Sequence, residues 1–86
     1  MYSLGQNYPN PFNPTTVITY QIPMAGVISL KVYNQLGQEV ATLFEGLKQP
    51  GSYDAVFDGS SLASGVYMYQ LSAPNYTESK KLVLLK

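Results

Sequence analysis

Two aspartates near the middle of the chain have the spacing that could support acid–base chemistry. Asp54 and Asp58 lie four residues apart in "GSYDAVFDG", and on a β-strand this spacing places both carboxylates on one face. Paired carboxylates cleave glycosidic bonds when they face each other across a cleft at roughly 5–9.5 Å. With loop carbonyls they could instead hold Ca²⁺. The simpler interpretation is one turn aspartate and one solvated strand aspartate.

The rest of the composition speaks against catalysis and metal binding. The 86 residues include no His and no Cys, so the usual general bases, nucleophiles and thiolate ligands are missing. We therefore expect a protein that is not an enzyme and that has no cofactor and no metal site.

Charge and hydropathy narrow the choice of partners. Five lysines balance five acidic residues, and Arg is absent, which argues against nucleic acid as a partner. No apolar run approaches the ~18 residues of a membrane span. No basic segment followed by an apolar one stands at the N-terminus, so we expect any export leader to lie upstream in a longer parent chain.

Alternating apolar and polar residues predict a small all-β domain. Strands are expected over residues 16–22, 27–33, 39–45, 52–58, 66–73 and 76–85, with a bulge in the third, where the alternation is imperfect. Turn residues separate these segments every eight to twelve positions, which is typical of a β-sandwich of six or seven antiparallel strands. The expected core residues are Ile18, Tyr20, Ile22, Ile28, Leu30, Val32, Val40, Leu43, Phe44, Tyr53, Ala55, Phe57, Tyr67, Tyr69, Leu71 and the run from Leu82 to Leu85.

Proline and glycine mark the remaining features. Residues 1–8 resemble a linker or processing tail, and the domain is expected over residues 9–86. Pro9, Pro11 and Pro14 fix φ and favour extended neighbours, which predicts a stiff segment that holds the domain away from whatever precedes it. Gly37 in "NQLGQ" is expected to have a positive φ in a tight hairpin.

Two further functions are compatible with this pattern. Exposed tyrosines such as Tyr33 or Tyr76 could stack on sugars, which would make the chain a carbohydrate-binding module of an extracellular enzyme. The domain could also be a purely structural accessory module. Alternation places most of the other tyrosines in the core, and Trp is absent.

Five segments in order resemble a known family. They are "YPNPFNPTTVITYQIP", "VISLKVYNQLGQEVATL", "PGSYDAVFDG", "LASGVYMYQLSA" and "KKLVLLK". Together they resemble the type A C-terminal sorting domain of proteins exported by the type IX secretion system. The part "VYNQLGQEV…DG…SGVY" is similar also to the immunoglobulin-like domain of flagellar hook-capping proteins. The resemblance implies an immunoglobulin-like β-sandwich.

The same resemblance implies a function and partners. The domain would be a monomeric signal that directs an upstream cargo domain through the periplasm and an outer-membrane translocon, to be secreted or placed on the cell surface. A surface sortase would then remove it or anchor the cargo. The family's motif positions, which we take as candidate recognition residues, fall on Pro9, Asn10, Pro11, Gly37, Gly65, Tyr67, Lys80, Lys81 and Lys86.

Overall fold

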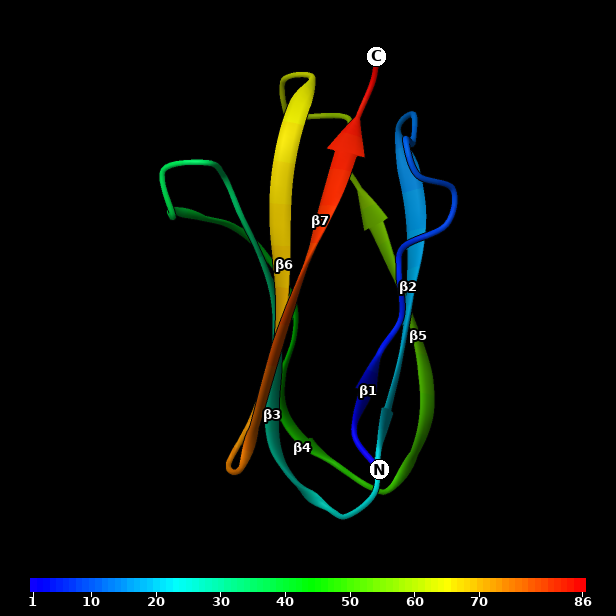
Figure 1. Cartoon of the computed structure of the whole chain (residues 1–86), viewed down its shortest axis with the longest axis vertical. Coiled ribbons are helices and arrows are strands. Elements are labelled where there is room, and N and C mark those ends of the chain that lie inside the picture. The colour runs from blue at the N-terminus through cyan, green and yellow to red at the C-terminus, as the bar shows by residue number, and fades with distance from the viewer.

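Seven β-strands make up the computed structural model, which describes residues 1–86 (Figure 1). The structure contains no helix that could cross a membrane. The strands are β1 (Ser3–Leu4), β2 (Thr15–Ile22), β3 (Gly26–Tyr33), β4 (Glu39–Lys48), β5 (Gly51–Asp58), β6 (Gly65–Ala73) and β7 (Tyr76–Leu84).

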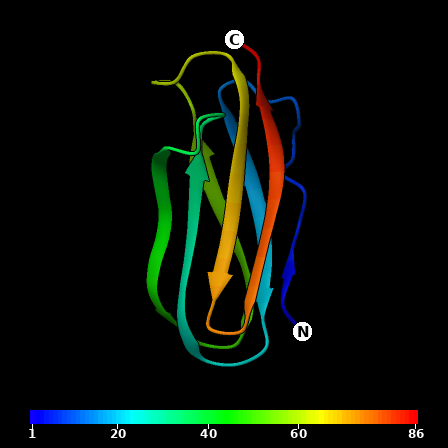
Figure 2. The same cartoon turned by 60° about the vertical axis from the view of Figure 1, so that its left-hand side comes forward.

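The strands form two facing sheets. A three-stranded sheet has the order β1-β2-β5 and a four-stranded sheet the order β4-β3-β6-β7, with antiparallel neighbours throughout. Figure 1 shows the two layers side by side, and Figure 2 shows the broad face of the four-stranded sheet. The predicted all-β, immunoglobulin-like sandwich is confirmed.

The six predicted strands are all present, and one strand was missed. Five of them differ from the expected bounds by a single residue, while β4 continues to Lys48 because Gly46, Leu47 and Lys48 stay in register with β3. The predicted bulge is confirmed by register shifts at Leu30/Lys31 and at Val32/Tyr33 of the β3–β4 pair.

The alternating apolar residues meet between the sheets. Ile18 on β2, Leu30 on β3 and Tyr69 on β6 are all completely buried, since each strand turns every second side chain inward. At the end of β7 the expectation holds in part: Leu82 and Leu84 are fully buried, whereas Leu85 lies beyond the strand and is 54% exposed.

The N-terminal residues differ from the detached linker that the sequence predicts. β1 pairs with β2 through Ser3 and Leu4, and Leu4 is buried. A two-residue strand is too short to show alternation, which is why sequence reasoning missed it. The following residues 5–12, here called the strap, also pack on the sandwich.

The prolines therefore do not hold the domain away from its N-terminus. The peptide bonds before Pro9, Pro11 and Pro14 are cis, and Phe12 between them is only 1% exposed, with its ring 5.9 Å from that of Phe57. Burial of a Phe side chain contributes about 2–3 kcal/mol, so the proline-rich stretch is part of the core.

The two termini lie at opposite ends of the molecule, whose longest Cα dimension is 37 Å (Figure 1). The end that carries Met1, here called the N-terminal end, also holds the turns between β2 and β3, β4 and β5, and β6 and β7. The other end, here called the C-terminal end, holds Lys86 and the connections 9–14, 34–38 and 59–64.

We expect Gly37 to be more sensitive to substitution than Gly26. Gly37 has φ 82°, as predicted, whereas Gly26 does not have a positive φ, and a Cβ at either position would meet no atom within 4 Å. Gly37→Val should lower the free energy of unfolding by about 1–2 kcal/mol through backbone strain alone. Gly26→Val should be neutral or stabilising, because a β-branched residue suits a strand. Chemical denaturation of both variants measures this, and a larger loss for Gly26→Val would contradict the assigned turn.

Candidate recognition surface

Buried hydrogen bonds fix the strap to the sandwich. The Tyr69 hydroxyl accepts a hydrogen bond from the Asn7 N–H at 2.9 Å and donates one to the Gly5 carbonyl at 2.6 Å. The Asn7 side chain, in a residue only 2% exposed, donates to the Thr16 hydroxyl at 3.1 Å and to the Pro9 carbonyl at 3.2 Å. Tyr69 was predicted as core, but nothing in the spacing of Asn7 or Thr16 indicated that they would be its polar partners.

The strap also covers the outer edge of β7. The Asn10 side-chain oxygen accepts a hydrogen bond from the Val83 N–H at 3.0 Å. Phe12 donates its N–H to the Val83 carbonyl at 2.9 Å and accepts from the Leu85 N–H at 3.0 Å. The Gln6 side chain donates to the Lys81 carbonyl at 2.9 Å. The candidate residues Pro9, Asn10 and Pro11 thus belong to a segment that closes this side of the sandwich.

A hairpin and a loop meet at the C-terminal end. Asn34 organises the hairpin, because its side-chain oxygen accepts the N–H groups of Leu36 at 2.9 Å and Gln38 at 3.0 Å. Leu36 is 83% exposed at the tip. A hollow of about 220 Å³ separates the hairpin from the start of β6, and its lining is Asn34, Gln35, Leu36, Ser64, Gly65, Val66 and Tyr67.

The structure therefore brings the candidate residues Gly37, Gly65 and Tyr67 to one end. Tyr67 itself is buried, and its hydroxyl donates to the Ala63 carbonyl at 2.7 Å. Tyr67 holds the 59–64 connection in place from the inside of the sandwich. The groups that a partner could touch here are therefore those of the 34–38 hairpin and the 59–64 connection.

The three candidate lysines do not gather. Lys80 shares the inward face of β7 with Leu82 and lies 3.5 Å from the Glu78 carboxylate, whereas Lys81 points to the opposite, solvent-exposed face. Lys86 lies at the C-terminal end, where its ammonium donates to the Ser60 carbonyl at 2.7 Å. The Ser60 N–H, with a smaller contribution from the charge of Lys86, lowers the pKa of Asp58 below its ordinary value.

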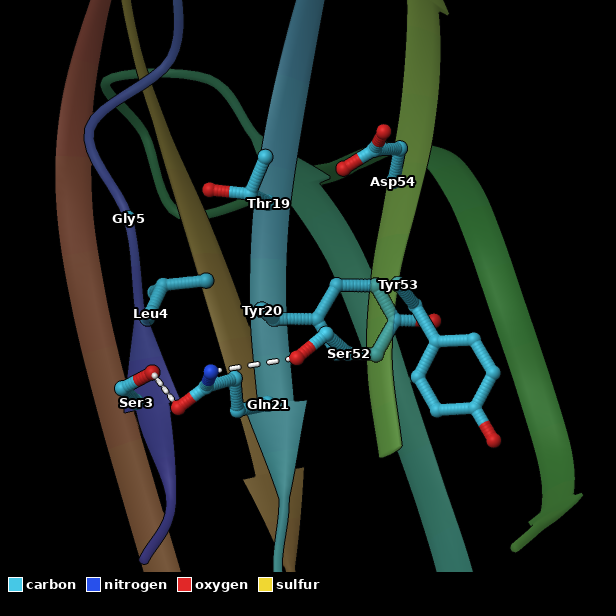
Figure 3. A pocket seen from close by; sticks show the side chains of 9 residues that line it. All are labelled: Ser3, Leu4, Gly5, Thr19, Tyr20, Gln21, Ser52, Tyr53 and Asp54. Atoms are coloured by element: carbon cyan, nitrogen blue, oxygen red, sulfur yellow. Dashed lines mark hydrogen bonds between the residues drawn. The ribbon is translucent and has the colours of Figure 1, made fainter. Parts of the chain in front are cut away.

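The second aspartate lies on the outer face of the three-stranded sheet. Asp54 lines a hollow of about 340 Å³ together with Thr19 and a row of hydrogen-bonded side chains from Ser3, Gln21 and Ser52 (Figure 3). No group of three or more His, Cys, Asp or Glu side chains is placed to hold a metal ion. This face offers polar contacts.

Tyr76 lies at the N-terminal end, and one of its ring faces is occupied. The Tyr2 ring stacks on it with 4.8 Å between centroids and 12° between planes. Its hydroxyl donates a hydrogen bond to the Glu78 carboxylate. Burial, followed by this hydrogen bond, raises the pKa of Tyr76 to about 12.

The sequence model of the family described as secretion system C-terminal sorting domain matches residues 6–85. The chain belongs to this family. No curated protein matches the chain. The match begins within the strap and ends one residue before Lys86, so the strap is part of the family's domain.

Family membership confirms the predicted resemblance to type IX secretion sorting domains. The sorting domain acts as a signal for type IX secretion, which carries proteins across the outer membrane to the cell surface or the extracellular space. Such a role requires a recognisable folded surface, and the domain is a sorting module of a larger parent protein.

We expect Tyr69→Phe to loosen the strap. The substitution removes the hydroxyl and leaves the Asn7 N–H and Gly5 carbonyl without a partner, which should lower the free energy of unfolding by about 2 kcal/mol. Tyr33→Phe is the matched control, because Tyr33 lies on the outer face of β3, and its loss should stay within about 0.5 kcal/mol. Denaturant unfolding compares the variants, and equal losses would contradict the importance of this hydroxyl.

We expect stability to fall at alkaline pH in part through Tyr76. The unfolded chain loses a tyrosine proton near the ordinary pKa of 10.0, whereas folded Tyr76 keeps its proton up to about 12. Its contribution is therefore complete below pH 10 and is lost as pH rises from 10 to about 12. Tyr76→Phe should flatten the pH dependence of the unfolding free energy in this window, although burial also raises the pKa values of Tyr20 and Tyr69. An unchanged slope would contradict this assignment.

Proposed function

We propose that the chain is the folded export signal of a cargo domain that precedes it, and that an outer-membrane translocon contacts the C-terminal end of the sandwich. The observation that carries this proposal is the placement of Met1 and Lys86 at opposite ends of the 37 Å axis (Figure 1). A cargo attached before residue 1 lies far from the hairpin and the 59–64 connection and leaves both accessible to a receptor.

The candidate residues divide into two roles under this proposal. Gly37, Gly65 and Tyr67 shape the C-terminal end, and Pro9, Asn10 and Pro11 hold the strap against β7. Leu36, Lys81 and Lys86 are exposed groups that a translocon component would touch. The 220 Å³ hollow beside Leu36 would take a side chain of that component.

The strap supports a proposal for the position of processing. A sortase needs an extended and accessible chain, but residues 3–12 are held by β2, β7 and Tyr69. We therefore place the processed bond before Ser3, so that removal of the signal releases the sandwich as an intact unit and leaves the cargo free or anchored at the surface.

The export of a passenger protein fused ahead of residue 1 tests the proposal. We expect secretion by a host with the type IX system and none by a host without it. Deletion of residues 82–86 should unfold the domain and abolish export together, because fully buried Leu82 and Leu84 are lost. Leu36→Ser should lower export while the thermal melt stays unchanged. Replacement of Lys80, Lys81 and Lys86 by Gln should also lower export with little change in the melt, because Lys81 and Lys86 are exposed and the Lys80–Glu78 pair is partly exposed, and such charges contribute little to stability.

Leu47→Ser is the matched control for the leucine variant. Leu47 is 64% exposed but lies near the N-terminal end, opposite Val27, so its loss should leave export intact. Equal export by the two leucine variants would remove the C-terminal end as the contact surface. Normal export of the 82–86 deletion would overturn the sorting role and favour a structural module.

A further inference from the structure

The edges of the two sheets are not equally protected. The strap covers the β7 edge, β1 has only two residues, and β4 is interrupted by the register shifts of the β3–β4 pair. Short strands, bulges and covering segments are the usual means of preventing edge-to-edge pairing. β5 has none of them, because its eight residues stay in unbroken register with β2 and pair with no other strand.

The backbone groups that β5 leaves free can be identified. Val17 exchanges both backbone hydrogen bonds with Tyr8, and the Thr19 carbonyl accepts the Gly5 N–H, so these β2 groups point away from β5. Their partners across the ladder are Val56 and Asp54. Since such opposite pairs are not hydrogen-bonded to each other, the N–H and C=O groups of Ser52, Asp54 and Val56 point toward the open edge.

The inner face of β4 lies opposite this edge and is incompletely covered. Phe44 and Ala41 occupy the same layers as Leu30 and Val32 on β3. Leu30 and Val32 are fully buried, whereas Phe44 and Ala41 remain partly exposed. β4 forms the outer edge of the four-stranded sheet (Figure 2). The free β5 edge and the partly exposed Phe44 thus lie on the same side of the sandwich, where the Lys48 ammonium is 4.3 Å from the centroid of the Phe44 ring and 4.1 Å from that of Tyr53.

The charges of β5 indicate what such a strand would carry. Its outward-facing side chains include Asp54 and Asp58, and it has no basic residue. Their neighbours on β2 are the uncharged Thr19 and Thr15. A cation beside a strand carboxylate is favourable and a like charge is unfavourable. A second copy of β5 would bring two more carboxylates into the same sheet, so self-pairing is the poorer fit.

From these observations we propose that β5 is a docking edge for an extended segment of a partner protein, in which Lys or Arg alternates with apolar residues. The segment extends the three-stranded sheet by one strand. Its basic side chains lie beside Asp54 and Asp58, and its apolar side chains face the rings of Phe44 and Tyr53 and the Lys48 side chain that lies over them. This surface runs along the side of the sandwich. Its Asp58 end borders the 59–64 connection, because the Asp58 carboxylate accepts the Ser60 N–H at 2.9 Å, so the part beside Asp54 is the part distinct from the proposed receptor contact.

Amide hydrogen exchange with a peptide probe tests the proposal on the 86-residue chain. The probe is a capped eight-residue peptide of alternating Lys and Val, and its counterpart alternates Glu and Val. We expect the Lys–Val peptide at saturation to slow exchange of the Ser52, Asp54 and Val56 amides by about tenfold or more. The Glu–Val peptide should leave them unchanged. No slowing, or equal slowing by both peptides, would overturn the proposal.

Two substitutions sharpen the test. Val56→Pro removes a free edge N–H without removing a bond to β2, and it should abolish the effect. Thr77→Pro is the matched control. Thr77 lies an even number of residues before Val83 on β7, so its backbone N–H also points toward the strap side and away from β6, and this variant should keep the effect. Asp54→Lys preserves the backbone and should reverse the preference between the peptides. Three outcomes would each overturn the proposal of a basic partner strand. They are slowing that persists in Val56→Pro, a peptide preference that is unchanged in Asp54→Lys, and protection of β5 that rises with protein concentration alone.

Discussion

One buried hydroxyl group anchors the segment that closes this sandwich. The three-stranded sheet has only a two-residue strand at its β1 edge, so the side between β1 and β7 would be open without the strap. Tyr69 reaches across the core from β6 and holds the strap at Gly5 and Asn7. With those two residues fixed, Phe12 enters the core and Asn10 reaches the Val83 N–H. The buried polar contact and the packing of Phe12 thus hold the same segment against the sandwich.

The sequence predicted the parts of the fold that follow from alternation. Ile18, Leu30 and Tyr69 were assigned to the core because they lie at every second position of long strands, and the bulge in β4 was visible as a break in that rule. Gly37 could be assigned from turn chemistry alone. These features depend on residues close together in the sequence, so short-range patterns are enough to predict them.

The strap could not be predicted in the same way. Asn7 and Asn10 have partners on strands remote in sequence, Tyr69 and Val83, so no short-range pattern identifies them. The prolines suggested a stiff spacer because fixed φ angles are compatible with any extended path, including the path along β7. For the candidate recognition residues, the motifs of the family indicated positions, while the structure separates the buried Tyr67 from the exposed Lys81 and Lys86.

The pairing of the strap with β7 also has a consequence for biosynthesis. Its partner atoms belong to Lys81, Val83 and Leu85, so Asn10 and Val83 meet across a separation of 73 residues. Contacts so distant in sequence form late, after the intervening loop has been closed. A polypeptide whose synthesis stops before residue 81 keeps the strap contacts to Val17 and Tyr69 but loses those to β7, so this side of the sandwich stays open. The closed sandwich therefore forms only after the ribosome has made the last strand.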